Sequence, residues 1–123
     1  MRFLFILFLA LHVAYGIDVK ADNMSSLLYN GNCITCHKNT KAKSAPSMFE
    51  IQSRYKSAFV TKEDFVDYMS KWVLNPNTET SLMRDAIKKY SLMPQLGFDA
   101  EMLRDIAKYI YENDFQTKST LNF

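Results

Sequence analysis

The stretch GNCITCHKN, residues 31–39, contains both cysteines of the chain and one of its two histidines. Two residues separate Cys33 from Cys36, and His37 follows directly. Two thiols one helical turn apart can each add to a vinyl group on one edge of a haem, and the adjacent imidazole can then ligate the iron. Cys-x-x-Cys-His is the attachment signature of c-type haem. The motif therefore predicts one covalently bound haem c, attached to Cys33 and Cys36, with His37 as an iron ligand.

Two other chemistries use closely spaced cysteines. Structural zinc normally has four protein ligands, whereas the chain has no second cysteine pair, so a carboxylate or a partner chain would have to complete the site. A disulfide-exchange motif would suit an exported protein, but such motifs lie beside a βαβ pattern, which is absent from this sequence. Haem attachment is the interpretation that uses both cysteines and the histidine.

The first 16 residues have the pattern of a secretory signal peptide. Arg2 precedes the apolar run FLFILFLALHVAYG, in which Ala14 and Gly16 match the −3 and −1 positions of a cleavage site. A second candidate cut follows Ala21. Residues 1–16 are therefore predicted to be removed on export, with an uncleaved membrane anchor as the alternative. Because c-type haem is attached outside the cytoplasm, the expected location is the bacterial periplasm, with no stable membrane insertion after cleavage.

Residues 17–123 form the predicted mature domain. Loss of Arg2 lowers the basic count from 15 to 14 against 13 acidic residues, so the mature net charge is +1. This balance gives no reason to expect nucleic-acid binding, which needs a concentrated basic face. His12 is removed with the signal peptide, which leaves His37 as the only histidine of the mature chain.

The mature sequence predicts a single all-α domain of four or five short helices. Apolar residues recur at helical spacing, and no segment shows the two-residue alternation of a strand. Thr61 and Asp99 are expected N-caps, and Asn75-Pro76 should end a helix. The C-terminal residues 117–123 should be frayed. The predicted helices lie around residues 24–28, 48–55, 61–74, 80–90 and 99–110.

The sixth iron position cannot be a second histidine, so methionine, lysine, a terminal amine and water are the candidates. Met93 differs from the other methionines because Pro94 disfavours helical geometry at the residue before it. A methionine in such a loop can direct its sulfur inward, so Met93 is the expected iron ligand; simple packing is the alternative. The remaining methionines keep helical spacing among apolar residues, where this residue type usually packs in a core: Met24, Met48, Met69, Met83 and Met102.

With these residues in place, the chain resembles the small monohaem class I cytochromes c over nearly the whole of residues 17–123. Residues 33–37 match the family's haem motif without departure. Tyr29 stands where the family has an aromatic residue on its N-terminal helix, and Tyr109 resembles the aromatic residue of the C-terminal helix that packs against it. The resemblance implies a cytochrome c fold, with the helices packed around one covalently attached haem.

The resemblance also assigns roles around the predicted haem. Pro46, in APSM, would accept a hydrogen bond from the other ring nitrogen of His37. Met93, in LMPQLGF, matches the axial-methionine loop, and Trp72 would lie near a haem propionate. There are two departures. Ala45 replaces a usual glycine, and the predicted helix over residues 80–90 is longer than in the most compact members.

Iron with histidine and methionine ligands has no open position for a substrate, and the thioether raises its reduction potential. The expected function is therefore one-electron transfer with redox partner proteins, without enzyme activity or a small-molecule substrate. Two alternatives stay open: a tightly bound cytochrome subunit of an exported dehydrogenase or oxidase, and, if Met93 does not ligate, a haem sensor or enzyme. A basic rim for transient docking is predicted from Lys38, Lys41, Lys43, Lys88 and Lys89, with an ordinary solvated surface as the alternative.

Overall fold

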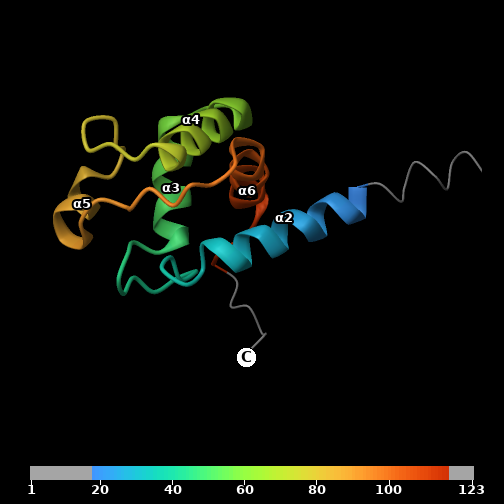
Figure 1. The fold of residues 1–123 in the computed structure, drawn as a ribbon, viewed down its shortest axis with the longest axis horizontal. Helices are drawn as coiled ribbons and strands as arrows, with labels where there is room; N and C mark the ends of the chain where they lie inside the picture. The colour runs from blue at the N-terminus through green and yellow to red at the C-terminus, as the bar shows by residue number, and fades with distance from the viewer. Residues whose placement is uncertain (1–17, 117–123) are drawn as a thin grey trace, which may run out of the picture.

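The computed structural model describes residues 18–116 and contains five helices without strands in this part of the chain (Figure 1). The all-α prediction is confirmed. The predicted signal peptide, residues 1–16, and the predicted frayed tail, residues 117–123, lie outside the described residues. The helices are α2 (Asp18–Asn32), α3 (Met48–Ala58), α4 (Lys62–Leu74), α5 (Arg84–Tyr90) and α6 (Ala100–Glu112). None of them combines the length and the apolar character that a membrane crossing requires.

Both predicted N-caps are present. The Thr61 hydroxyl accepts a hydrogen bond from the backbone N–H of Asp64 at 3.1 Å, at the start of α4. The Asp99 carboxylate accepts from the N–H groups of Glu101 and Met102 at the start of α6. Such caps satisfy backbone donors that have no partner within the helix. Helix α4 ends at Leu74, directly before Asn75-Pro76, as predicted.

The predicted helix over residues 80–90 is wrong in its first turn, because α5 contains only seven residues and starts at Arg84. Local polar side chains explain the difference. Asn77 Oδ1 accepts from the N–H of Glu79 at 2.7 Å, and Ser81 Oγ accepts from the N–H of Met83 at 3.0 Å. Asn and Ser side chains that bond nearby backbone groups compete with helix formation. The helix before Met93 is therefore not the long one that the sequence predicted.

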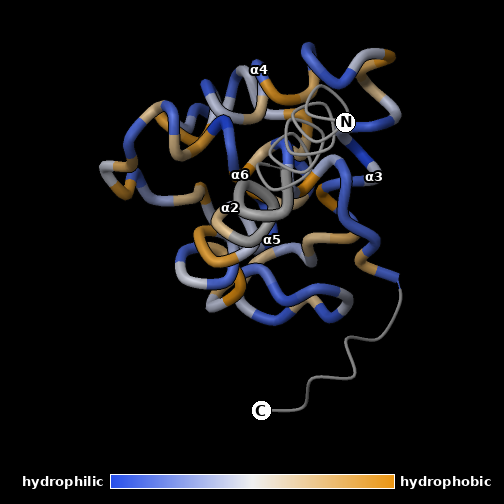
Figure 2. The backbone as a smooth tube through the Cα atoms, turned by 90° about the vertical axis from the view of Figure 1, so that its right-hand side faces the viewer, coloured by the Kyte–Doolittle hydropathy of each residue, from blue (hydrophilic) through white to orange (hydrophobic). Residues whose placement is uncertain are grey.

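The core forms where α6 packs against α4 and α2, with α3 contacting both α4 and α6. Figure 2 shows hydrophobic and hydrophilic residues interleaved along the backbone, as expected for helices that bury one face. Tyr29 on α2 is 1 % exposed, and its ring lies 5.1 Å from that of Tyr109 on α6, measured between ring centroids. The predicted aromatic contact between the first and last helices is confirmed.

Phe115 is a core residue that the helical pattern did not reveal. It lies beyond the end of α6, is 1 % exposed, and places its ring 5.5 Å from Tyr29. The Tyr29 hydroxyl donates to Asn39 Oδ1 at 3.1 Å. Phe115 thus packs against the ring of Tyr29 and Asn39 holds its hydroxyl, four residues before Cys33.

Gln52 joins α3 to the end of α6. It is buried, and its amide nitrogen donates to the carbonyl oxygens of Ile110 at 2.6 Å and Asn113 at 2.7 Å. The last carbonyl groups of a helix have no partner within the helix. Gln52 therefore supplies, from one side chain, donors to carbonyl groups at the C-terminal end of α6.

Replacing Gln52 with methionine should lower the free energy of unfolding by about 2 kcal/mol, because Gln52→Met keeps the volume but leaves buried carbonyls without a donor. For a domain of this size, thermal unfolding should then occur roughly 10 °C lower. Ser57→Ala is the matched control on the same helix, since it removes only an exposed hydroxyl bonded to the Ser53 carbonyl. It should change stability by no more than about 0.5 kcal/mol. Equal melting temperatures for Gln52→Met and Ser57→Ala would contradict the capping role.

Candidate functional site

One cavity of about 280 Å³ brings together the four residues that the sequence singled out, Cys33, Cys36, His37 and Met93. The first three follow α2, and Met93 lies between α5 and α6. Side chains from α3, α4, α5 and α6 complete the wall, which is mainly apolar. Among these further lining residues are Met48, Tyr55, Met69, Trp72, Ala86 and Ile106.

The cysteine motif continues α2 as tight turns. The N–H of Cys33 donates to the carbonyl of Tyr29 at 2.9 Å, and the N–H groups of Cys36 and His37 donate to the carbonyl of Cys33 at 3.3 and 2.9 Å. These bonds keep both thiols and the imidazole beside the same cavity. The thiols differ in environment: Cys33 is half-buried, and burial raises its pKa to about 11, whereas Cys36 is exposed.

His37 is oriented by a backbone carbonyl. Its Nδ1 lies 2.9 Å from the oxygen of Pro46, the contact expected from the family resemblance, and this contact is confirmed. A carbonyl oxygen can only accept, so Nδ1 carries the proton and Nε2 keeps its lone pair. Burial lowers the pKa of His37 and so favours the neutral ring, while the hydrogen bond to Pro46 acts in the opposite direction and only partly offsets this effect. Metal-binding histidines commonly have this second hydrogen bond, which sets the tautomer and the ring orientation.

The segment that carries Pro46 is held against the motif. The N–H of Met48 donates to the carbonyl of Lys38, and the N–H of Phe49 donates to that of Asn39, both at 2.9 Å. Ser47 is buried and caps α3 by accepting from the N–H of Glu50. The start of α3 therefore positions the Pro46 carbonyl. Ala45 has a negative φ, so the turn before Pro46 does not require glycine at this position.

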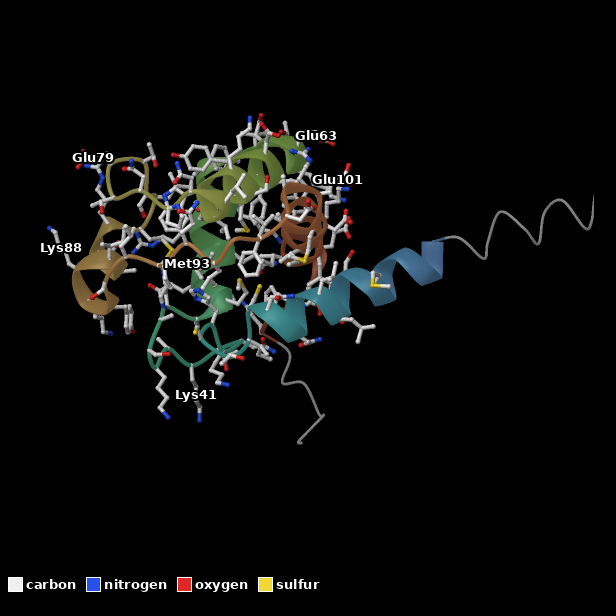
Figure 3. All side chains as sticks on the ribbon, in the orientation of Figure 1. Lys41, Glu63, Glu79, Lys88, Met93 and Glu101 are labelled. Carbon is white, nitrogen blue, oxygen red and sulfur yellow. The ribbon has the colours of Figure 1, made fainter. Side chains whose placement is uncertain are left out.

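Met93 lies in the non-helical segment between α5 and α6, as predicted from Pro94, and it is half-buried. Figure 3 shows Met93 on this segment, near the middle of the domain, whereas Lys41 and Lys88 stand at its edge. The structure thus brings Met93 to the cavity that His37 also lines.

Three other methionines line the same cavity, each at most 6 % exposed: Met48, Met69 and Met83. Met48 and Met69 belong to helices, as the sequence indicated. Met83 does not, because it is the N-cap residue of α5. The expectation that Met83 lies on a helical face is therefore wrong. Because Met83 is buried at the cavity and lies outside a helix, its sulfur is the main alternative to that of Met93 as an iron ligand.

Two aromatic side chains complete the site. Trp72, which the sequence predicts near a haem propionate, lines the cavity, and its indole N–H donates to the carbonyl of Asn77 at 3.0 Å. Tyr55, which the sequence reading did not assign to the site, is buried beside the cavity, and burial raises the pKa of its hydroxyl. The helical spacing of apolar residues indicated that Tyr55 lies on the inner face of α3. Such spacing does not distinguish a residue of the core from one that lines a binding cavity.

The predicted basic rim is exposed to solvent at all five of its lysines. Within residues 24–116, Lys38, Lys41, Lys43 and Lys88 take part in no ion pair. Lys89 lies over the ring of Tyr90, with its nitrogen 4.9 Å from the ring centroid.

Exposed leucines stand beside the same cavity: Leu92 and Leu96, which both line it, are 40 % and 51 % exposed.

Among the described side chains, no three from histidine, cysteine, aspartate or glutamate form a group that could hold a metal ion. Comparison of the chain with protein-family models, curated proteins and solved structures gave no match.

Proposed function

We propose that this protein is an exported monohaem c-type cytochrome that carries single electrons. One observation carries the proposal: Cys33, Cys36, His37 and Met93 line one apolar cavity, and the Nδ1 atom of His37 is bonded to the Pro46 carbonyl. This is the set of groups that a covalently attached, doubly ligated haem requires, and it is assembled from two distant parts of the chain.

Each of these residues has a defined role in the proposal. Cys33 and Cys36 hold the group through thioether bonds, and His37 offers Nε2 to the iron because Nδ1 donates to Pro46. Met93 offers a neutral sulfur, which favours the reduced state. When bound, the haem supplies one-electron exchange, and the protein tunes it through ligands, hydrogen bonds and burial. Because His37 and Met93 would both ligate the iron, no position would stay open for a substrate, and the proposed function is electron transfer without enzyme activity.

The size and lining of the cavity fit a large apolar group. At 24 cal/mol per Å³, a closed cavity of about 280 Å³ would cost on the order of 7 kcal/mol. This is an upper limit, because the cavity reaches the surface at the exposed Cys36. It is nevertheless comparable with the total stability of a typical domain, about 5–15 kcal/mol. We therefore expect the folded protein to need a bound group that fills this space.

The surface around the cavity favours transient docking with a redox partner. Unpaired lysines and two partly exposed leucines would suit a partner face with acidic groups around an apolar centre. Charge complementarity of this kind mainly raises association rates, which suits a diffusible carrier. The alternative is a subunit bound permanently to an exported dehydrogenase or oxidase, which would form a complex that survives purification.

The proposal is tested with the full-length chain expressed in a bacterium that exports and matures c-type cytochromes. The purified protein should exceed its polypeptide mass by one haem and keep its colour in acid-acetone. Its reduced form should show sharp low-spin bands, and the oxidised form a weak band at the red end of the spectrum from sulfur ligation. Freely extractable pigment would overturn covalent attachment. Ready binding of carbon monoxide at neutral pH would favour the sensor or enzyme alternative.

A further inference from the structure

Ser91 has a backbone conformation that residues other than glycine avoid. Its φ is 73° and its ψ is 168°, a region that is essentially restricted to glycine because a Cβ atom crowds the neighbouring peptide groups. Among residues 18–116, Ser91 is the only residue other than glycine with a positive φ. Such conformations persist only where the surrounding structure imposes them, and they concentrate at ligand clamps and switch regions.

Contacts on both sides of Ser91 impose this conformation. Its N–H donates to the carbonyl of Ile87 at 2.8 Å, which closes the end of α5. Four residues later, the side-chain amide of Gln95 donates to the carbonyl of Leu74, the last residue of α4, at 3.2 Å. The segment 91–95 is thus tied to α5 at one end and to α4 at the other. Ser91 has to make the turn that leads Met93 to the cavity.

We propose that Ser91 is a positioning residue whose backbone strain weakens the hold of Met93 on the iron. This inference rests on the proposed function, in which Met93 is an axial ligand. The strain is present while the segment 91–95 keeps Met93 at the cavity. When the segment moves away, Ser91 returns to an ordinary φ and the strain is released. A small neutral ligand that competes with Met93 therefore binds more readily than the sulfur chemistry alone would allow.

Two substitutions at the same position separate strain from the loss of the hydroxyl. Ser91→Gly removes the Cβ atom and with it the strain, whereas Ser91→Ala keeps the Cβ atom. Displacement of Met93 is measured in the haem-containing protein by titration with imidazole, followed in the visible spectrum. Strain of this kind should change the equilibrium constant for displacement of Met93 by roughly five- to hundredfold. The added freedom of glycine in the displaced segment acts in the opposite direction and should reduce this change by about two- to fivefold. Ser91→Gly should therefore bind imidazole about tenfold more weakly than Ser91→Ala, which should match the wild type.

Gln95→Gly is the control for glycine itself. It is compared with Gln95→Ala, since both variants lose the bond to the Leu74 carbonyl and only the first adds glycine, at a position with an ordinary φ. Glycine there only adds freedom to the displaced segment, so Gln95→Gly should bind imidazole about two- to fivefold more tightly than Gln95→Ala. If Gln95→Gly bound imidazole more weakly than Gln95→Ala, the effect would belong to glycine in general and the strain proposal would be overturned. Equal affinities of Ser91→Gly and Ser91→Ala, in protein that shows sulfur ligation, would overturn it and leave the proposed function intact. Wild-type protein without sulfur ligation would overturn both the strain proposal and the proposed role of Met93 as an iron ligand.

Discussion

Alanine at both Cys33 and Cys36 is expected to abolish covalent haem and to yield almost no stably folded protein. No thioether can form in this double variant, so any haem present should extract freely into acid-acetone. The second effect follows from the cavity, because an unfilled space of about 280 Å³ costs up to about 7 kcal/mol, against a total of about 5–15 kcal/mol. The measurements are the mass of the purified chain, acid-acetone extraction and the yield of soluble protein.

Thr35→Ala is the matched control, since Thr35 stands between the two cysteines, is exposed and carries no thiol. It should retain the haem, the visible spectrum and the yield of the wild type. The single variants Cys33→Ala and Cys36→Ala should each keep at most one thioether and give little mature protein. A double variant whose pigment still resists extraction would show that the motif has been misinterpreted.

Met93→Ala should erase the weak band of sulfur ligation at the red end of the oxidised spectrum. Because the thioether favours reduced iron, the reduction potential should fall by on the order of 0.1 V, within the range of about 0.8 V that axial ligands span. The sixth position should also open to carbon monoxide in the reduced protein and to cyanide in the oxidised protein. The spectrum, a redox titration and ligand titrations measure these three effects separately.

Met83→Leu and Met102→Leu are the controls, and Met83→Leu is the more stringent of the two. Met102 lies on α6 and does not line the cavity, so its replacement tests only packing. Met83 is buried at the cavity outside a helix, so Met83→Leu tests the rival sulfur directly. Both variants should keep the sulfur-ligation band, since leucine has a similar volume. Loss of the band in Met83→Leu with retention in Met93→Ala would assign the ligand to Met83.

The sequence by itself determined the features that depend on neighbouring residues. The Cys33-x-x-Cys36-His37 motif, the caps Thr61 and Asp99, and the non-helical backbone at Met93 all follow from residue types at short spacing. Each needs only local geometry: a hydroxyl or carboxylate three residues from an N–H, or a proline that restricts the residue before it. The all-helical class followed from the same local periodicity.

The tertiary structure decided what depends on contacts between distant segments. Gln52 is buried on α3 because its amide reaches the carbonyl groups of Ile110 and Asn113 at the end of α6. Phe115, outside any helical pattern, is buried because Tyr29 lies beside it. The strained turn at Ser91 exists because α4 and α5 hold the two ends of its segment. His37 and Met93 likewise line one cavity only because the helices between them fold back. Burial and strain are properties of the packed chain, so no local pattern of residues can specify them.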